Sequence, residues 1–180
     1  NIHRQSLFDV TDINKSKVKC VKVKLKKINP KTLVNTYNFR LDKKNFLKLI
    51  NKYEFIVDGS DNFNTKFLIN DFALKFKKFL TVGAISKFDG HIFTYNFKDK
   101  KLPCLRCFFQ EKNISNEILN CEHEGVLGTV AGIVGTLQAN EVLKQILDIG
   151  KSLNGEILIV DLLNLSFRKA KINKRKNCIC

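Results

Sequence analysis

Apolar residues follow two different patterns along the chain, and the pattern changes after residue 84. Before that point, apolar residues spaced three and four apart alternate with short apolar runs, as in helices that alternate with buried strands. After it, alternating apolar residues around a turn at Asp89-Gly90 predict a hairpin over 85–97. Helix–strand alternation followed by hairpins predicts an α/β fold, with a parallel sheet extended by antiparallel strands.

The segment 15–29 fits two elements, because Val21, Val23 and Leu25 alternate with Lys while a helical stripe also runs from Val18 to Ile28. We interpret it as a helix that stops before Pro30. Asp42 is expected to cap the helix that follows it. The predicted helices are 15–29, 43–51, 63–77 and 126–147, and the predicted strands outside the hairpin are 33–39, 55–57, 79–84, 157–161 and 167–172.

Length and composition indicate one globular domain over residues 1–180. The chain has 180 residues, 44% of them hydrophobic and 27% charged, which argues against disorder and against a small disulfide-stapled fold. The uncharged stretch 125–140 is too short and too rich in glycine to span a bilayer. No Met and no leader are present, so we expect an N-terminally truncated, cytoplasmic protein.

The net charge of +15 would suit nucleic acid, an anionic membrane or an acidic protein. However, Lys, Asn, Ile and Phe, all with A/T-rich codons, supply 78 of the 180 residues, so genome composition explains much of the charge. Only 5 of the 32 basic residues are Arg, the usual reader of phosphates and bases. We therefore expect neither a nucleic-acid nor a membrane partner.

Two close cysteine pairs, Cys104 with Cys107 and Cys178 with Cys180, are candidate metal ligands. Two pairs of thiolates suit a tetrahedral zinc ion, although the C-x-C spacing of the second pair is less common than C-x-x-C. A redox C-x-x-C motif and a disulfide are the alternatives. We favour structural zinc.

Cys121 stands alone before a glycine-rich helix start, which suits a small buried residue or a nucleophile with a lowered thiol pKa. The polar segment of roughly 109–123 around it predicts a mobile loop over the active site. Asp58 and Asp61 directly follow an apolar strand, where a carboxylate could hold Mg²⁺ on a nucleotide or form an Asx turn that caps the next helix. Arg4 and Lys17 are candidate phosphate contacts.

Taken together, these motifs resemble the MoeB/ThiF/HesA adenylyltransferases, relatives of the ubiquitin-activating enzymes, over essentially the whole chain. The segment Asn1-Ile-His-Arg4-Gln5 resembles their N-x-x-R-Q motif, and Lys17 falls at their helix-opening Lys. The other matching segments are the D-x-x-D-N motif from Asp58 to Asn62, the zinc knuckle Cys104 to Cys107, and the segments 121–128 and 135–141.

The resemblance implies a Rossmann-like sheet that binds ATP and Mg²⁺. It also implies adenylylation of the C-terminal glycine of a ubiquitin-like sulfur-carrier protein, for molybdopterin or thiamine synthesis, by a homodimer. By analogy, Asn1, Arg4 and Lys17 contact the phosphates and Asp61 coordinates Mg²⁺. The nucleotide site also takes in Gln5 and Asn62, zinc binds the four paired cysteines, and Cys121 is a further candidate catalytic residue.

The sequence departs from the family in three ways. The family's first strand–helix–strand, with its glycine-rich phosphate loop, precedes the N-x-x-R-Q motif, so we expect residues 1–180 alone to be inactive. Lys66 stands where many members have Arg. Cys180 lies one position before the family's last zinc ligand, so either Cys180 replaces it or that ligand lies beyond the end. The alternative function is a non-catalytic, zinc-stabilised protein-interaction module.

Overall fold

The computed structural model describes residues 2–109 and 125–180. Its contacts divide the chain into two compact units, residues 1–41 and 42–180, which are described separately below. None of the helices in the described ranges is long and apolar enough to cross a membrane.

The first unit is built around one helix. Asp9 caps the short turn η2, because its side chain accepts the backbone N–H of Thr11 at 2.8 Å. The predicted helix over 15–29 is confirmed as α1 (Lys17–Ile28), with Asn29 as its extended C-cap just before Pro30. Its elements are η1 (Ile2–Arg4), η2 (Val10–Asp12) and α1 (Lys17–Ile28).

The strand predicted over 33–39 is wrong for the described structure. The segment is extended, and the rings of Tyr37 and Phe39 lie 5.8 Å apart on one side of it, as alternation requires. It pairs with no other described segment, however, and Leu33 is 82% exposed. A strand also needs a neighbour to bond, which this segment lacks within the described residues.

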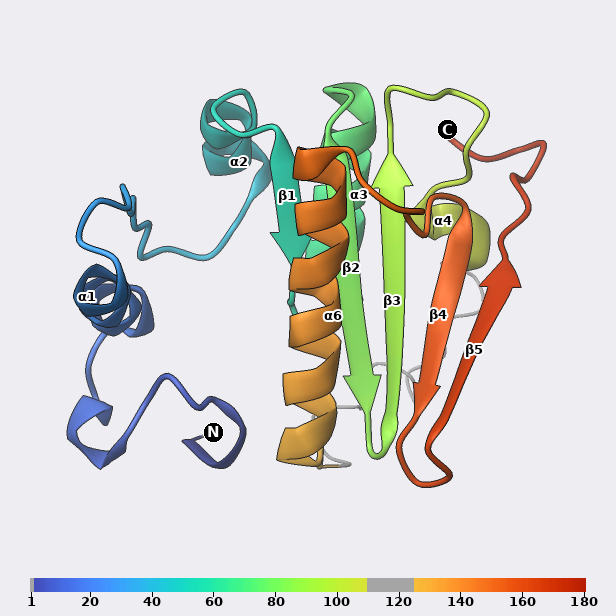
Figure 1. Cartoon of the computed structure of the whole chain (residues 1–180). Helices are drawn as coiled ribbons and strands as arrows, with labels where there is room; N and C mark the ends of the chain where they lie inside the picture. The colour runs from blue at the N-terminus through green and yellow to red at the C-terminus, as the bar shows by residue number, and fades with distance from the viewer. Residues whose placement is uncertain (1, 110–124) are drawn as a thin grey trace. The chain divides into compact units, whose positions relative to one another are not determined.

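The second unit is a five-stranded mixed sheet in the order β1-β2-β3-β4-β5 (Figure 1). β1 pairs with β2 in parallel, and the three remaining pairings are antiparallel. This confirms the α/β class: of the four strand pairings in the described ranges only that of β1 with β2 is parallel, and isolated parallel bridges also join Lys87 to Val126 and Thr94 to Asn154. The elements are α2 (Lys43–Ile50), β1 (Phe55–Asp58), α3 (Phe63–Lys75), β2 (Phe79–Ser86), β3 (Asp89–Asn96), α4 (Leu105–Phe108), α6 (Gly128–Leu147), β4 (Glu156–Asp161) and β5 (Ser166–Lys171).

Helices cover both faces of this sheet. The long helix α6 lies on one face, and α3 and α4 lie on the other (Figure 1). Val130 and Val134 of α6 are buried against Ile92 of β3 and Val160 of β4. Each side chain of this kind contributes about 1.5–3 kcal/mol when it is fully removed from water. The strands β2 and β3 are thus largely buried, whereas β5 is almost entirely exposed.

The hairpin is real, but its turn was placed two residues too late. Ser86 pairs with Asp89, so Lys87 and Phe88 form the connection, with Lys87 at φ 46°. Gly90 lies inside β3, where a Cβ atom would sit 2.3 Å from a methyl group of Val134. This glycine is therefore explained by the close approach of α6 to the sheet, not by a turn.

Candidate functional site

The loop that follows β1 carries the D-x-x-D-N motif, and each of its polar residues has a different environment. Asp58 is buried and accepts the backbone N–H of Ser60 at 2.8 Å, which makes an Asx turn. Asn62 caps α3 by accepting the N–H of Thr65 at 2.9 Å. Asp61 is exposed and accepts a hydrogen bond from the Asn62 side chain at 3.2 Å. Asp58 makes the Asx turn and Asn62 caps α3, so neither role falls to Asp61. The exposed Asp61 carboxylate follows the carboxyl end of β1.

A buried ion pair lies beneath this loop. The Lys66 ammonium of α3 is 3.3 Å from the Asp58 carboxylate and donates to the carbonyl of Gly83 at 2.7 Å. Burial lowers the pKa of Lys66, and the charge of Asp58 opposes that shift. The pair therefore joins α3 to the end of β1 and to the interior of β2, in a region where an unpaired charge would be costly.

Gln138 of α6 contacts the end of β1 at Asp58 from the face of the sheet opposite to α3 (Figure 1). Its side-chain N–H group donates to the backbone carbonyl of Asp58 at 2.9 Å and approaches that of Thr81 at 3.4 Å. A Cβ atom on Gly83 would lie 2.3 Å from the Gln138 side-chain oxygen, so only glycine leaves room for this amide. The base of the Asp61 loop is thus held by α3, β2 and α6 together.

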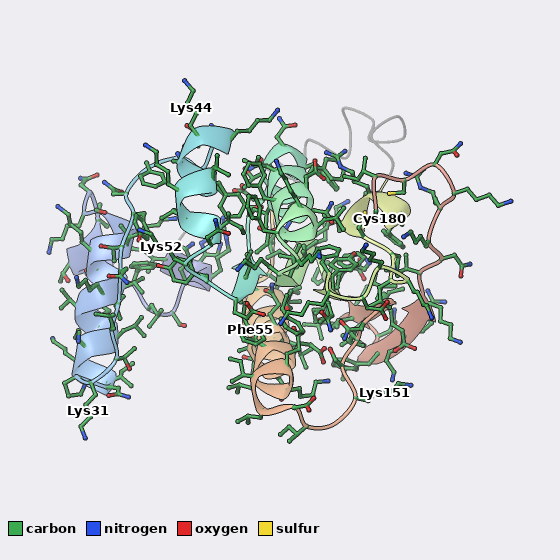
Figure 2. The ribbon with its side chains drawn as sticks, turned by 90° about the horizontal axis from the view of Figure 1, so that it is seen from above. Lys31, Lys44, Lys52, Phe55, Lys151 and Cys180 are labelled. Carbon is green, nitrogen blue, oxygen red and sulfur yellow. The ribbon has the colours of Figure 1, made fainter. Side chains whose placement is uncertain are left out.

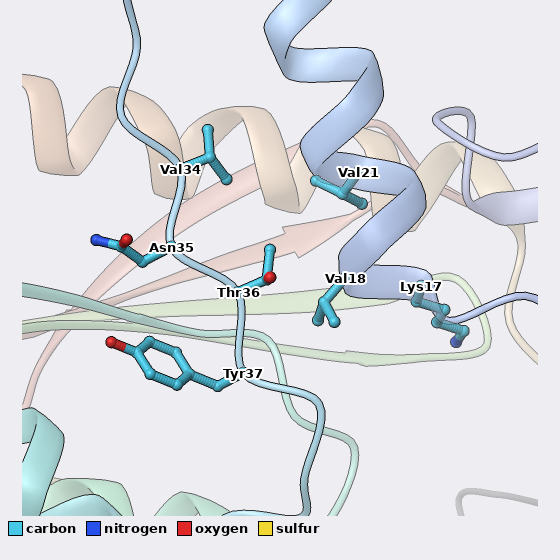
Figure 3. A pocket seen from close by; sticks show the side chains of 7 residues that line it. All are labelled: Lys17, Val18, Val21, Val34, Asn35, Thr36 and Tyr37. Carbon is cyan, nitrogen blue, oxygen red and sulfur yellow. The ribbon is translucent and has the colours of Figure 1, made fainter.

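Lys17 stands at the start of α1, between two cavities of the first unit. One cavity, of about 360 Å³, is bounded by α1 and the extended segment 34–37; Val18 and Val21 point toward that segment from the helix (Figure 3). The other, of about 200 Å³, has both Gln5 and Lys17 in its wall. The structure thus brings together these two residues of the predicted nucleotide site.

Ion pairs hold η2 against α1 beside the smaller cavity. Lys24 contacts the carboxylates of Asp9 at 3.1 Å and Asp12 at 2.5 Å. The Thr11 hydroxyl and the Lys24 ammonium lower the pKa of Asp9 to about 2. Arg4 is half-buried, with its guanidinium 2.9 Å from the imidazole nitrogen of His3. Asn1, the remaining predicted phosphate contact, lies outside the described residues.

The four paired cysteines converge on one point. All four sulfur atoms lie within 4.8 Å of one another, with Cys104 3.5 Å from Cys178 and Cys107 3.4 Å from Cys180. Figure 2 shows Cys180 beside α4, which carries Cys107. Four thiolates around a zinc ion at about 2.3 Å stand about 3.8 Å apart, so the spacing fits such an ion and is too long for disulfides.

Burial raises the pKa of the Cys104 thiol, and burial also raises that of Cys180, to about 11. For Cys178, burial acts in the same direction but is outweighed by hydrogen bonds from the Cys180 backbone and the neighbouring thiols, which leave its pKa at about 7. A bound dication would shift all of these thiols toward thiolates, so metal binding at this cluster releases protons.

Hydrogen bonds join the Cys104–Cys107 segment to α3, and a further hydrogen bond joins the C-terminal tail to that segment. Arg106 makes a two-pronged contact with Asp71, at 2.7 and 2.8 Å, and the backbone N–H of Leu105 donates to the buried Asn70 side chain at 2.9 Å. Arg175 donates to the carbonyl of Arg106 at 2.7 Å. The segment that carries Cys104 and Cys107 is thus bonded to α3, the helix whose N-terminus is capped by Asn62 next to Asp61.

The model of the ThiF family matches residues 1–180, the whole of the chain. The chain belongs to the ThiF family. This ThiF-family chain is 36% identical, over 99% of its length, to a sulfur carrier protein adenylyltransferase of Thermus thermophilus, of which it covers 67%. It is 40% identical, over 98% of its length, to a probable molybdopterin-synthase adenylyltransferase of Pyropia yezoensis, of which it covers 46%. The ThiF-family chain therefore spans about half to two thirds of the length of these relatives.

Solved structures confirm the fold of this ThiF-family chain. It superposes on the microcin C7 biosynthetic enzyme MccB, in complex with N-formylated MccA, with a TM-score of 0.82 over 99% of its length and 56% of that chain, at 18% identity. A structure of Escherichia coli MccB with ATP gives a TM-score of 0.80 over 99% of this chain and 54% of that one, at 19% identity. At this level of identity the likeness establishes the Rossmann-like fold alone.

The sequence nominated Asp61 and Lys17 as site residues and paired the four cysteines that the structure brings together, but it did not indicate the contacts that hold them in place. Lys66 was noted only as a departure from Arg, and Gln138 only as a letter within a longer motif. For both Lys66 and Gln138, the signal available in the sequence was a polar residue at a helical position expected to face the sheet. Cys121 and almost all of the predicted 109–123 loop lie outside the described residues.

Proposed function

We propose that the full-length protein adenylates the C-terminal glycine of a ubiquitin-like sulfur-carrier protein with ATP. The observation that carries this proposal is the exposed Asp61 carboxylate, held at the carboxyl end of β1 by a buried network, in a chain whose relatives are named as adenylyltransferases of sulfur carriers and molybdopterin synthase. Ligands of open α/β sheets bind at that edge.

In this reaction a carboxylate oxygen of the carrier attacks the α-phosphorus of ATP. The bond from that phosphorus to the bridging oxygen breaks, and pyrophosphate leaves with the electron pair. Both reactants are anions, so cationic side chains must offset their repulsion. Lys17 and Arg4 supply these cations in our proposal, Gln5 and Asn1 contribute neutral amide contacts to the nucleotide, and positioning of the two reactants supplies much of the rest.

Asp61 is the residue that we assign to Mg²⁺, with Asn62 beside it. An exposed carboxylate that need not cap its helix is free to take a hard cation, which prefers oxygen ligands and keeps several waters. When bound, the ion neutralises phosphate charge. Asp58, in contrast, is committed to Lys66 and Ser60, so we assign it a structural role.

The cysteine cluster has a structural role in the proposal. Cys104, Cys107, Cys178 and Cys180 would hold one zinc ion, with Cys180 as the fourth ligand, because its sulfur completes a compact group of four. The ion would tie the C-terminal tail to the Cys104–Cys107 knuckle at α4, which is bonded to α3, and so stabilise the second unit. A homodimer, as the family resemblance implies, and a cytoplasmic location are further parts of the proposal.

The test is direct detection of the carrier adenylate. Full-length protein is incubated with ATP, Mg²⁺ and either a thiamine-type or a molybdopterin-type carrier, and the intact mass of the carrier is measured. We expect an adenylate on one of the carriers and none on a matched carrier that lacks the final glycine. Absence of the adenylate from both carriers would contradict the proposal, and the carrier that reacts identifies the pathway.

A further inference from the structure

Two turns that lie side by side at one end of the sheet carry an exposed apolar surface. The turn between β2 and β3 meets the turn between β4 and β5, because the backbone N–H of Leu162 donates to the carbonyl of Phe88 at 3.1 Å. The start of α6 joins them, since the N–H of Leu127 donates to the Lys87 carbonyl at 3.3 Å (Figure 1). We call this surface the apolar patch; its residues are Phe88 (42% exposed), Leu127 (49%), Leu163 (68%) and Leu165 (78%).

The turn that carries the two most exposed leucines is fixed in shape. The Asp161 carboxylate accepts the backbone N–H groups of Leu163 at 2.9 Å and Asn164 at 3.0 Å, and also the side-chain N–H of Asn164 at 2.8 Å. Leu165 follows at φ 53°, a left-handed conformation that costs a residue other than glycine about 1–2 kcal/mol. Turns ordinarily carry polar residues or glycine at such positions. A rigidly held, exposed leucine there points to a partner that covers it.

The composition of this surface suits a protein partner. Residues 162–165 carry no charge, whereas Lys87, Asp89 and Asp161 border them. An apolar centre with a charged border is typical of interfaces between proteins. The two carboxylates in that border are unfavourable to phosphate groups, so the surface does not suit nucleic acid or an anionic membrane.

The apolar patch stands at the same end of the sheet as Asp61, because β1, β2 and β4 all point to that end (Figure 1). β1 and β4 are three strand spacings apart, which is about 14 Å. β2 continues four residues past Val82, the partner of Asp58, so the turn after it projects about 13 Å beyond the end of β1. The diagonal is about 19 Å, which about six residues of extended chain can span.

We propose that the apolar patch docks the folded body of the carrier protein, while the carrier's C-terminal tail of about six extended residues reaches Asp61. The inference rests on the proposed function, because it takes the carrier as the protein whose C-terminus reacts beside Asp61. A flexible tail loses conformational freedom when it binds, so a separate contact for the folded body offsets that loss. The patch supplies this contact with side chains that are already in place. Because the contact is equally strong before and during the reaction, it lowers the KM for the carrier and leaves the maximal rate unchanged.

Leu127→Asn and Leu165→Asn together test this docking in the full-length protein. Both positions suit Asn, because Leu127 is the N-cap of α6 without a side-chain cap and Leu165 has a left-handed backbone that Asn tolerates. The matched control is Leu147→Asn, which removes an exposed leucine at the other end of α6. With ATP saturating, we expect the double variant to raise the KM for the carrier about 10-fold at an unchanged maximal rate, while L147N behaves as wild type.

Binding of carriers that lack the final glycine separates this inference from the proposed function, since no adenylate can form on them. The thiamine-type and the molybdopterin-type carrier are both titrated, and we expect the wild type to bind one of them about 10-fold more tightly than the double variant does, whether or not adenylation is detected. Equal affinities and equal KM values would overturn the docking and leave adenylation standing. Failure of the wild type to bind either carrier would overturn it as well.

A second copy of the chain is the rival occupant, and sedimentation of the wild type and the double variant distinguishes it. A wild-type dimer that becomes a monomer in the double variant would assign the apolar patch to a second copy and overturn the docking of the carrier. If the double variant does not fold, Leu165→Asn alone carries the same measurements, because its side chain is the most exposed of the four.

Discussion

The Lys66 ammonium and the Asp58 carboxylate form a buried ion pair, 3.3 Å apart, directly beneath the loop that presents Asp61. Because Lys66 also bonds to the Gly83 carbonyl, the pair joins α3 to the end of β1 and to the interior of the neighbouring strand β2. A charged side chain with its own fixed partners cannot easily serve a ligand, so we assign Lys66 to positioning and Asp61 to binding.

Lys66→Met should destabilise the protein by about 3–5 kcal/mol, because it leaves the buried Asp58 carboxylate without its cation. The control is Lys75→Met, which removes an exposed lysine of the same helix and should change stability by about 0.5 kcal/mol or less. Urea unfolding of both variants measures the difference. Equal stabilities would mean that the buried pair contributes nothing.

Gly83→Ala should push the Gln138 side chain away from the sheet, since the new methyl group would lie 2.3 Å from the Gln138 oxygen. We expect a loss of about 1–3 kcal/mol in stability. Gly132→Ala provides the contrast: that glycine lies within α6 with nothing within 4 Å of a Cβ atom, so the same change should stabilise by about 0.5–1 kcal/mol. Thermal unfolding that shifts in the same direction for both would refute this account of Gly83.

The first unit should lose stability in acid through Asp9. Its pKa is about 2 when folded and 3.8 ordinarily, so the unfolded chain binds more protons between these values. The contribution of Asp9 is therefore complete above about pH 4 and is lost as the pH falls toward 2. In NMR titrations, Thr11→Val should raise the pKa of Asp9 more than Lys24→Met does, because the Thr11 hydroxyl is the larger cause. The reverse order would contradict the assignment.

Removal of one cysteine of the cluster should release the metal. Cys178→Ser is expected to lower the zinc content of reductively purified protein and its melting temperature, because the proposed ion would tie the tail to the Cys104–Cys107 knuckle at α4. Cys20→Ser, in the first unit, should retain zinc, since Cys20 lies outside the cluster. Equal metal content in the two variants would exclude Cys178 as a ligand.

Local signals in the sequence were enough for much of the fold. The Asp42 cap and the helix it begins are confirmed, because a capping side chain and the first turn lie within four residues. The two cysteine pairs meet as their spacing suggested. The turn at Asp89-Gly90 was misplaced because the sequence alone does not distinguish a glycine required for close helix packing from a glycine required for a turn.

Contacts between distant segments could not be predicted in this way. Gln138 and Asp58 are 80 positions apart, and Leu105 and Asn70 are 35 apart. Neither contact leaves a local pattern, because each depends on which helix covers which face of the sheet. The sequence could therefore nominate Asp61 as a ligand, whereas the support beneath it became visible only in the folded chain.

The most direct test of the account is ATP–pyrophosphate exchange by the full-length protein carrying Asp61→Asn, with carrier protein and Mg²⁺ present. Asn keeps the shape of the side chain and removes its charge, and Asn62 still caps α3. Asp89→Asn, at another exposed carboxylate, is the control. We predict that Asp61→Asn lowers exchange by about 100-fold or more while unfolding as the wild type does, and that Asp89→Asn exchanges normally. Wild-type exchange by Asp61→Asn would contradict the role that we assign to Asp61.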